Sequence, residues 1–283
     1  MNNSLIMIGQ PDSGKSNYLG RLWEDIRTEA GMISFVNADN IAYLEELLSH
    51  LLHGSFAPRS DKNIEQSRHD VKLTVKRRNI DGNFDLVVPD VTGELWKAAV
   101  ANSDLPEEWM SSLEEAKGAL LFLRDGSEEN HQPLDWVTSR DLLRRLPSQG
   151  GEIAAPTQVI YSELLRFLQL KLRRDSHGSR PKVAVLITAW DRVDPEYRRK
   201  PPLDYLKKQF PLLAGRIETV ENLEIRLFGT SVVGGDLEND PEFKTRFQNG
   251  DIKDFGYSVV DIGDHQVSEI RDLTLPLSWL MEP

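Results

Sequence analysis

Short apolar runs alternate with amphipathic stretches along most of the chain. Residues 4–8 form an apolar run that predicts a strand, and Leu19, Leu22, Trp23 and Ile26 then recur at the spacing of one helix face. Strands alternating with helices indicate an α/β fold with a mostly parallel sheet in three layers. The same patterns predict further strands at 32–36, 71–75, 84–88, 119–123, 183–187, 223–228 and 257–261, and further helices at 39–53, 106–117, 158–174, 203–210 and 276–280.

One pair of predicted strands has no helix between its members. Val71, Leu73 and Val75 alternate with polar residues, which is typical of a half-buried strand, and the apolar run 84–88 follows a turn signal at 81–82. This pair predicts a hairpin, and hence one antiparallel strand in the otherwise parallel sheet.

Four short motifs directly follow predicted strands, after Ile8, Val88, Ile187 and Phe228. In sheets of this type, ligands bind outside the carboxyl ends of the strands. Segments separated by some 220 residues of chain are therefore expected to meet at one edge of the sheet.

The first motif, GQPDSGKS at residues 9–16, fits the phosphate-loop pattern G-x-x-x-x-G-K-[ST] between a strand and a helix. Its backbone N–H groups would surround a phosphate, Lys15 would add a positive charge, and the Ser16 hydroxyl would bind Mg²⁺. The competing interpretation is a glycine-rich turn with an exposed lysine. The predicted nucleotide contacts in this segment are Asp12, Ser13, Gly14, Lys15, Ser16 and Asn17.

Charge and composition narrow the classes of function. The chain has 34 Lys and Arg against 45 Asp and Glu, a net charge of −11, which argues against direct binding of nucleic acid. It has no cysteine, so thiolate chemistry and Cys-ligated metals are excluded. Its apolar runs are short, and its first residues lack the pattern of a secretion signal. These features predict a cytoplasmic protein without a membrane span.

The order of the motifs resembles the Ras-like P-loop GTPases of the translation-factor (TRAFAC) class. The resemblance implies that Asp90, in D-x-x-G at 90–93, helps to hold Mg²⁺, and that the Gly93 N–H senses the γ-phosphate. Glu94 stands where this class usually has the glutamine that orients the attacking water. The resemblance thus implies binding of GTP and GDP and slow, Mg²⁺-dependent hydrolysis. The alternative for Asp90 is an ordinary turn residue at a strand end.

The class reads its base with [NT]-K-x-D, and residues 188–191 are TAWD. The resemblance assigns guanine recognition to Thr188 and Asp191, with Ser231 and Val232 as the counterpart of a further base motif. Ala189 stands where the class has a lysine over the base, so adenine remains an alternative. Trp190 is expected to be a core residue.

A polar loop at 56–66 lies between the helix expected at 39–53 and the hairpin. In such GTPases a hydroxyl group from this region binds Mg²⁺ when the loop closes, and Ser60 is the candidate here. The neighbouring Arg59 would then act as an internal arginine finger. The competing interpretation is a solvated loop without catalytic residues.

The extra helix at 39–53 and an insert at about 125–180 make the chain most similar to the bacterial double-GTPase-type proteins of conflict and phage-defence operons. This resemblance implies one GTPase domain over 1–283 that gates protein partners encoded nearby, with a role in antiviral defence. Two alternatives stay open: an ATP-hydrolysing P-loop protein, and a nucleotide-gated interaction module with negligible turnover.

Overall fold

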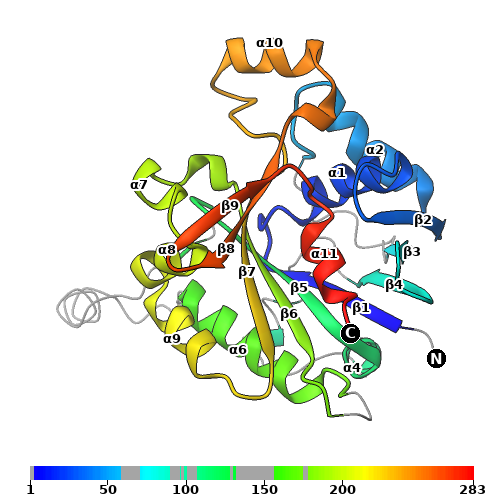
Figure 1. Cartoon of the computed structure of the whole chain (residues 1–283), viewed down its shortest axis with the longest axis vertical. Helices are drawn as coiled ribbons and strands as arrows, with labels where there is room; N and C mark the ends of the chain where they lie inside the picture. The colour runs from blue at the N-terminus through cyan, green and yellow to red at the C-terminus, as the bar shows by residue number, and fades with distance from the viewer. Residues whose placement is uncertain are drawn as a thin grey trace, which may run out of the picture.

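A central sheet of nine strands organises the computed structural model of the chain, in the order β2-β3-β4-β1-β5-β6-β7-β8-β9 (Figure 1). The structure describes residues 3–58, 71–89, 96, 99–100, 107–127, 130–131, 156–174 and 178–283. The strands are β1 Asn3–Gly9, β2 Ile33–Ala38, β3 Val71–Arg77, β4 Asn83–Val88, β5 Ala116–Arg124, β6 Lys182–Thr188, β7 Glu224–Ser231, β8 Tyr257–Gly263 and β9 Gln266–Ile270.

The centre of the sheet is parallel, as the alternation of strands and helices predicted. Strand β1 lies between β4 and β5, and β5, β6 and β7 follow in parallel register. Strands β3 and β4 form the expected antiparallel hairpin. The sheet also contains β8 as a second antiparallel strand, paired with β7 and β9. Strand β9 was not predicted, because its five residues are polar or half-exposed and give no apolar run.

Most helices in the described part of the chain cover the two faces of the sheet as outer layers. The described helices are α1 Lys15–Arg27, α2 Ile41–Leu52, α4 Glu107–Glu115, α6 Thr157–Lys171, α7 Pro195–Arg198, α8 Pro202–Gln209, α9 Pro211–Thr219, α10 Pro241–Asn249 and α11 Leu275–Leu280, with 3₁₀ turns at Trp190–Arg192 and Ile252–Asp254. Helices α9 and α10 were not predicted. Each begins with a proline in its first turn, where the missing N–H costs nothing. None of the described helices is long and apolar enough to span a membrane.

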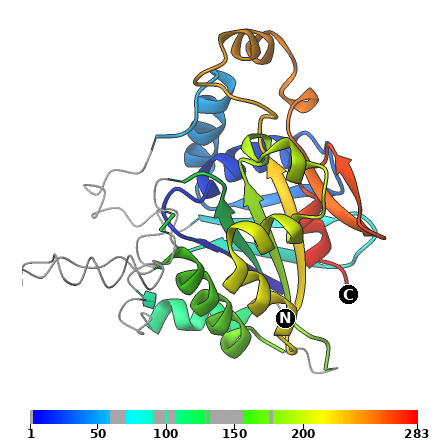
Figure 2. The ribbon, with the colours of Figure 1, turned by 90° about the vertical axis from the view of Figure 1, so that its left-hand side faces the viewer.

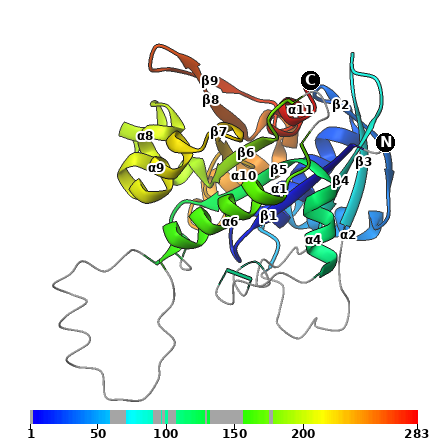
Figure 3. The same cartoon turned by 90° about the horizontal axis from the view of Figure 1, so that it is seen from below.

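Alternate residues of β1 point into two separate cores. Leu5 and Met7 pack with α1, α2 and α11, whereas Ile6 and Ile8 pack with α4, α6, α8 and α9. Figure 3 shows α4 and α6 along one face of the sheet. The fully apolar pattern of residues 5–8 thus reflects a strand buried on both faces, in the middle of a three-layer α/β fold.

Helix α2 packs against α1, the helix that follows the phosphate loop, and the end of α2 contacts α10. A Cβ on Gly20 of α1 would lie 2.8 Å from the backbone carbonyl carbon of Leu47, so the two helices approach closely only because residue 20 is glycine. At the other end of α2, Gln248 of α10 donates a hydrogen bond to the His53 carbonyl at 2.8 Å. Figure 2 shows α10 beyond the carboxyl ends of the strands, above the end of α2.

Replacement of Gly229 by alanine is expected to destabilise the fold. Gly229 lies in β7, where a Cβ would sit 2.3 Å from the ring of Trp190, which is fully buried as predicted. Overpacking of this kind costs about 1–3 kcal/mol of unfolding free energy. The urea midpoints of the variant and of Gly215→Ala would be compared, because an added Cβ on Gly215 in α9 meets nothing within 4 Å. Equal midpoints for the two variants would contradict this packing.

Candidate functional site

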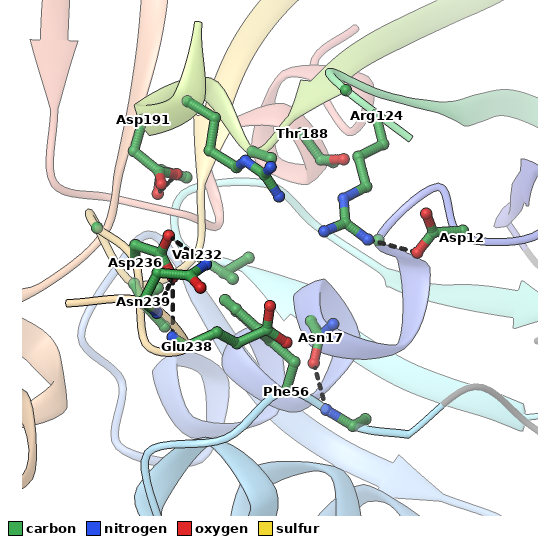
Figure 4. Close-up of a pocket in the computed structure, with 18 of the residues that line it drawn as sticks. Asp12, Asn17, Phe56, Arg124, Thr188, Asp191, Val232, Asp236, Glu238 and Asn239 are labelled. Atoms are coloured by element: carbon green, nitrogen blue, oxygen red, sulfur yellow. Dashed lines mark hydrogen bonds and ion pairs between the residues drawn. The ribbon is translucent and has the colours of Figure 1, made fainter. Parts of the chain in front are cut away.

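A cavity of about 560 Å³ lies at the carboxyl edge of the sheet. Its walls come from the loops after β1, β5, β6 and β7 and from residues 56–58 after α2 (Figure 4). The volume is within the range of small-molecule sites. Three of the four segments that were expected to converge do so here, whereas the motif after Val88 lies outside the described residues. The lining includes Asp12, Gly14, Asn17, Thr188, Asp191, Ser231 and Val232.

The phosphate-loop lysine is buried within its own loop. Lys15 is 3% exposed, and its Nζ donates to the carbonyl oxygens of Gly9 at 2.8 Å and Gln10 at 2.9 Å, and to Ser13 Oγ at 3.3 Å. The alternative of a glycine-rich turn with an exposed lysine is therefore wrong. The loop carbonyls fix the ammonium group at the start of α1, where the helix dipole also favours an anion.

Gly14 allows the phosphate loop to approach the end of β6 closely. Its φ of 88° is in the left-handed region, and a Cβ there would lie 2.9 Å from Thr188 Oγ1. Thr188 in turn donates a hydrogen bond from Oγ1 to the Ser13 carbonyl at 2.8 Å. The last residue of β6 thus holds the phosphate loop directly, a contact between positions 175 residues apart in the chain.

The turn after β6 presents a carboxylate to the cavity. Ala189 takes a left-handed conformation with φ of 56°, and a 3₁₀ turn then carries Asp191 (Figure 4). Ser231 at the end of β7 donates its hydroxyl to Asp191 Oδ1 and accepts the Gly234 N–H at 2.9 Å. These bonds hold the carboxylate in one orientation beside the cavity.

Burial raises the pKa of Asp191 above its ordinary value. The hydrogen bond from Ser231 opposes this rise, and so do the positive charges of Arg198 and Arg192. Desolvation thus disfavours the ionised form, whereas the hydroxyl and the two guanidinium groups favour it. The carboxylate therefore occupies a low-dielectric position in which hydrogen bonds to a ligand are strengthened.

Two contacts connect the phosphate loop to α2 and the segment after it. Asn17 Oδ1 accepts the Ala57 N–H at 2.8 Å (Figure 4). Burial raises the pKa of Tyr43 to about 12, and a side-chain hydrogen bond with Ser16 opposes the rise. Ser16, a predicted metal ligand, is thus linked to α2, and Asn17, a predicted nucleotide contact, is linked to the segment that follows α2.

Five predicted residues lie outside those that the structure describes: Arg59, Ser60, Asp90, Gly93 and Glu94. Their assignments stay predictions. Strand β4, which leads toward Asp90, runs parallel to β1 and ends on the same side of the sheet.

Several lining residues were not found by sequence reasoning: Phe56, Arg124, Arg192, Asp236 and Glu238. Arg124 pairs with Asp12 across the phosphate loop, and Phe56 lies on the opposite wall (Figure 4). A charged residue directly after the apolar run 119–123 was a usable signal for Arg124. Phe56 carried none, because it stands at the start of a polar loop.

The sequence profile of the family described as Double-GTPase 1 matches residues 6–280, nearly the whole chain. The chain belongs to the Double-GTPase 1 family. The description of this family names a GTPase, and the matched range of this Double-GTPase 1 protein includes the phosphate-loop motif at residues 9–16. The family expected from the sequence is thereby confirmed. No curated protein matches the chain.

Solved structures similar to this Double-GTPase 1 protein include three GTPase-type domains. The GTP-bound GTPase-like domain of S. cerevisiae Ski7 is 14% identical, with a TM-score of 0.41 over 80% of this chain and 42% of that chain. The SRb-GTP/SRX complex from Chaetomium thermophilum is 14% identical, with a TM-score of 0.40, over 88% and 98%. The G domain of T. maritima FeoB is 12% identical, with a TM-score of 0.30, over 87% and 99%.

The chain spans 42%, 43% and 25% of the first three solved structures that it matches.

Proposed function

We propose that this protein is a GTP-dependent switch that hydrolyses GTP slowly with Mg²⁺ and gates protein partners in its GTP state. One observation carries the proposal: Thr188 holds the phosphate loop while Asp191, three residues later, is fixed by Ser231 beside the same cavity. A phosphate site and a base-reading carboxylate are therefore rigidly connected. The connected pair suits a nucleotide that is held at both of its ends.

The proposed base is guanine. Its N1–H and exocyclic amine are adjacent donors, and the Asp191 carboxylate offers two acceptor oxygens. Adenine presents an acceptor at N1 instead, so the same carboxylate would face an unfavourable lone pair. Ser231 and Val232 would bound the base on the β7 side, as both line the cavity.

The proposed phosphate site consists of the loop N–H groups of residues 12–17 and the Lys15 ammonium. The hydroxyl of Ser16, with Asp90 and Ser60, would supply the oxygen ligands for Mg²⁺. The Ser16 side chain fits this role because it is a hard oxygen donor directly after Lys15 and next to Tyr43. When bound, the ion would neutralise phosphate charge.

The proposed hydrolytic residues come from the segment after β4 and from the loop after α2. The Gly93 N–H would contact the γ-phosphate, Glu94 would position water, and Arg59 would balance charge. A carboxylate near a triphosphate is itself repelled by the phosphates, because both are anionic. Turnover by the isolated chain is therefore expected to be slow.

The proposed switch uses the segment that follows α2. Asn17 binds the Ala57 N–H, and Phe56, Ala57 and Pro58 line the cavity. A change at the phosphates would thus alter a segment whose other end leads to Arg59 and Ser60, and a partner would read that change. We further propose one domain over 1–283, a cytoplasmic location, partners encoded nearby and a role in defence against phage.

Calorimetric titration of the purified chain with GTP, GDP and ATP in Mg²⁺ tests this function. Both guanine nucleotides are expected to bind, and ATP is expected to bind at least about tenfold more weakly, because one mismatched polar pair costs 1–3 kcal/mol. Equal or tighter binding of ATP would contradict guanine recognition and favour the ATP-hydrolysing alternative. Phosphate release would then be measured, since brisk turnover by the chain alone would exclude an interaction module with negligible hydrolysis.

A further inference from the structure

An arginine at the end of β5 forms part of the wall of the proposed nucleotide cavity. Arg124 is the last residue of β5 and lies opposite Thr188 in the register with β6. Its guanidinium pairs with the Asp12 carboxylate of the phosphate loop (Figure 4). The side chain therefore runs from the β5–β6 junction to the phosphate loop along the cavity wall.

The pair is held in place from both sides. Ser127 donates its hydroxyl to the second oxygen of Asp12 at 2.7 Å, and Asn130 donates to the Arg124 carbonyl at 2.9 Å. Asp12 itself has a left-handed φ of 57°. An arginine with both its backbone and its guanidinium anchored loses little freedom when a ligand binds against it.

Two of the lining residues near Arg124 in the chain and in the sheet are small. Ala189, which follows Thr188 in the neighbouring strand, contributes only a methyl group to the cavity lining. On the other side, Gly126 has no side chain, and a Cβ there would meet nothing within 4 Å. Arg124, whose side chain is 25% exposed, is one of two arginines in the lining, the other being Arg192 in the turn that carries Asp191.

We propose that Arg124 is a nucleotide-positioning residue whose guanidinium plane, fixed by Asp12, packs against the purine nucleoside. The inference deepens the proposed function, because it requires a purine between the phosphate loop and Asp191. A guanidinium edge engaged with a carboxylate keeps its face available, and such faces stack on aromatic rings.

Titrations of Arg124→Ala and Arg124→Lys with GDP and GTP test the inference. Arg124→Ala is expected to weaken both nucleotides by the same factor, about tenfold, because a stacked cation contributes about 1–2 kcal/mol. Arg124→Lys is expected to fall between wild type and Arg124→Ala, since it keeps the charge without the plane. In turnover assays KM would rise while kcat stays within about twofold. A loss confined to GTP, or much larger for GTP, would overturn the stacking role.

A double variant separates contact with the nucleotide from simple neutralisation of Asp12. If Arg124 only cancels that charge, Asp12→Ala/Arg124→Ala would bind GDP as tightly as wild type, and this result would overturn the inference. If Arg124 contacts the nucleoside, the double variant stays about as weak as Arg124→Ala. Arg166→Ala is the matched control, because Arg166 pairs with Glu163 at 2.7 Å on the exposed face of α6.

A failure of this inference can be distinguished from a failure of the proposed function. If wild type prefers ATP, guanine recognition fails, but the same comparison made with ADP and ATP still reports stacking on a purine. Melting temperatures of all variants would be recorded with the titrations. Loss of binding in Arg124→Ala at an unchanged melting temperature supports the positioning role, and unchanged binding overturns it.

Discussion

Replacement of Lys15 by alanine is expected to abolish measurable binding of GTP. The ammonium group is 3% exposed and is held by the carbonyls of Gly9 and Gln10 and by Ser13 Oγ at the start of α1, so a phosphate that takes over one of these bonds meets a positioned cation. Charge-assisted hydrogen bonds each contribute about 1.5–3 kcal/mol, and a phosphate at this position would accept one or more of them. Affinity should therefore fall by at least about 100-fold. The measurement is calorimetric titration with GTP and GDP in Mg²⁺.

Two controls belong with the Lys15 variant. Lys171→Ala removes a lysine that pairs with Glu114 on the surface at 3.1 Å, and its affinity should stay unchanged. The melting temperature of Lys15→Ala must also be recorded, because the variant leaves loop carbonyls without their cation. A well-folded Lys15→Ala protein that binds GTP like wild type would defeat the assignment of the phosphate site.

Replacement of Asp191 by asparagine is expected to exchange guanine for xanthine specificity. Asparagine offers one carbonyl acceptor and one amide donor, whereas aspartate offers two acceptors. Xanthine has a carbonyl oxygen where guanine has its amine, so the asparagine amide would find a partner on xanthine and face a donor on guanine. GTP affinity should fall about 100-fold or more, since a charge-assisted bond is lost and a polar group is left unpaired.

The readout is the ratio of dissociation constants for GTP and xanthosine triphosphate. Wild type should favour GTP, and Asp191→Asn should favour the xanthine nucleotide. Asp264→Asn is the matched control, because Asp264 is exposed in the β8–β9 turn at a φ of 50° that asparagine tolerates. An unchanged ratio in Asp191→Asn would show that this carboxylate does not read the base.

The segments that carry Lys15 and Asp191 are connected to each other. Ser231 at the end of β7 orients Asp191, and Thr188 at the end of β6 donates a hydrogen bond to the Ser13 carbonyl of the phosphate loop. A disturbance at Asp191 is therefore expected to reach the phosphate loop through the short backbone segment 188–191 and the hydrogen bond from Thr188. Substitutions at Thr188 and Asp191 lie close enough together to couple, so their effects are not expected to add.

The elements with strong periodicity followed from the sequence alone. The parallel centre of the sheet, α1, α2 and the β3–β4 hairpin were all predicted, because burial on one or both faces leaves a clear pattern of apolar positions. The phosphate loop was also predicted from the sequence, because its pattern requires glycine, lysine and serine at a fixed spacing. Elements such as β9 and α10 bury few side chains, so their sequences carry little pattern.

What the sequence determined by itself was the order of the strongly patterned strands and helices, the phosphate loop, and the carboxylate that follows β6. Only the tertiary structure decided which residues meet across strand ends: Ser231 with Asp191, Thr188 with Ser13, and Arg124 with Asp12. The physical reason is that local patterns report burial and backbone conformation, which depend on near neighbours. Contacts between side chains from different strands depend on sheet order and register, and these are properties of the whole folded chain.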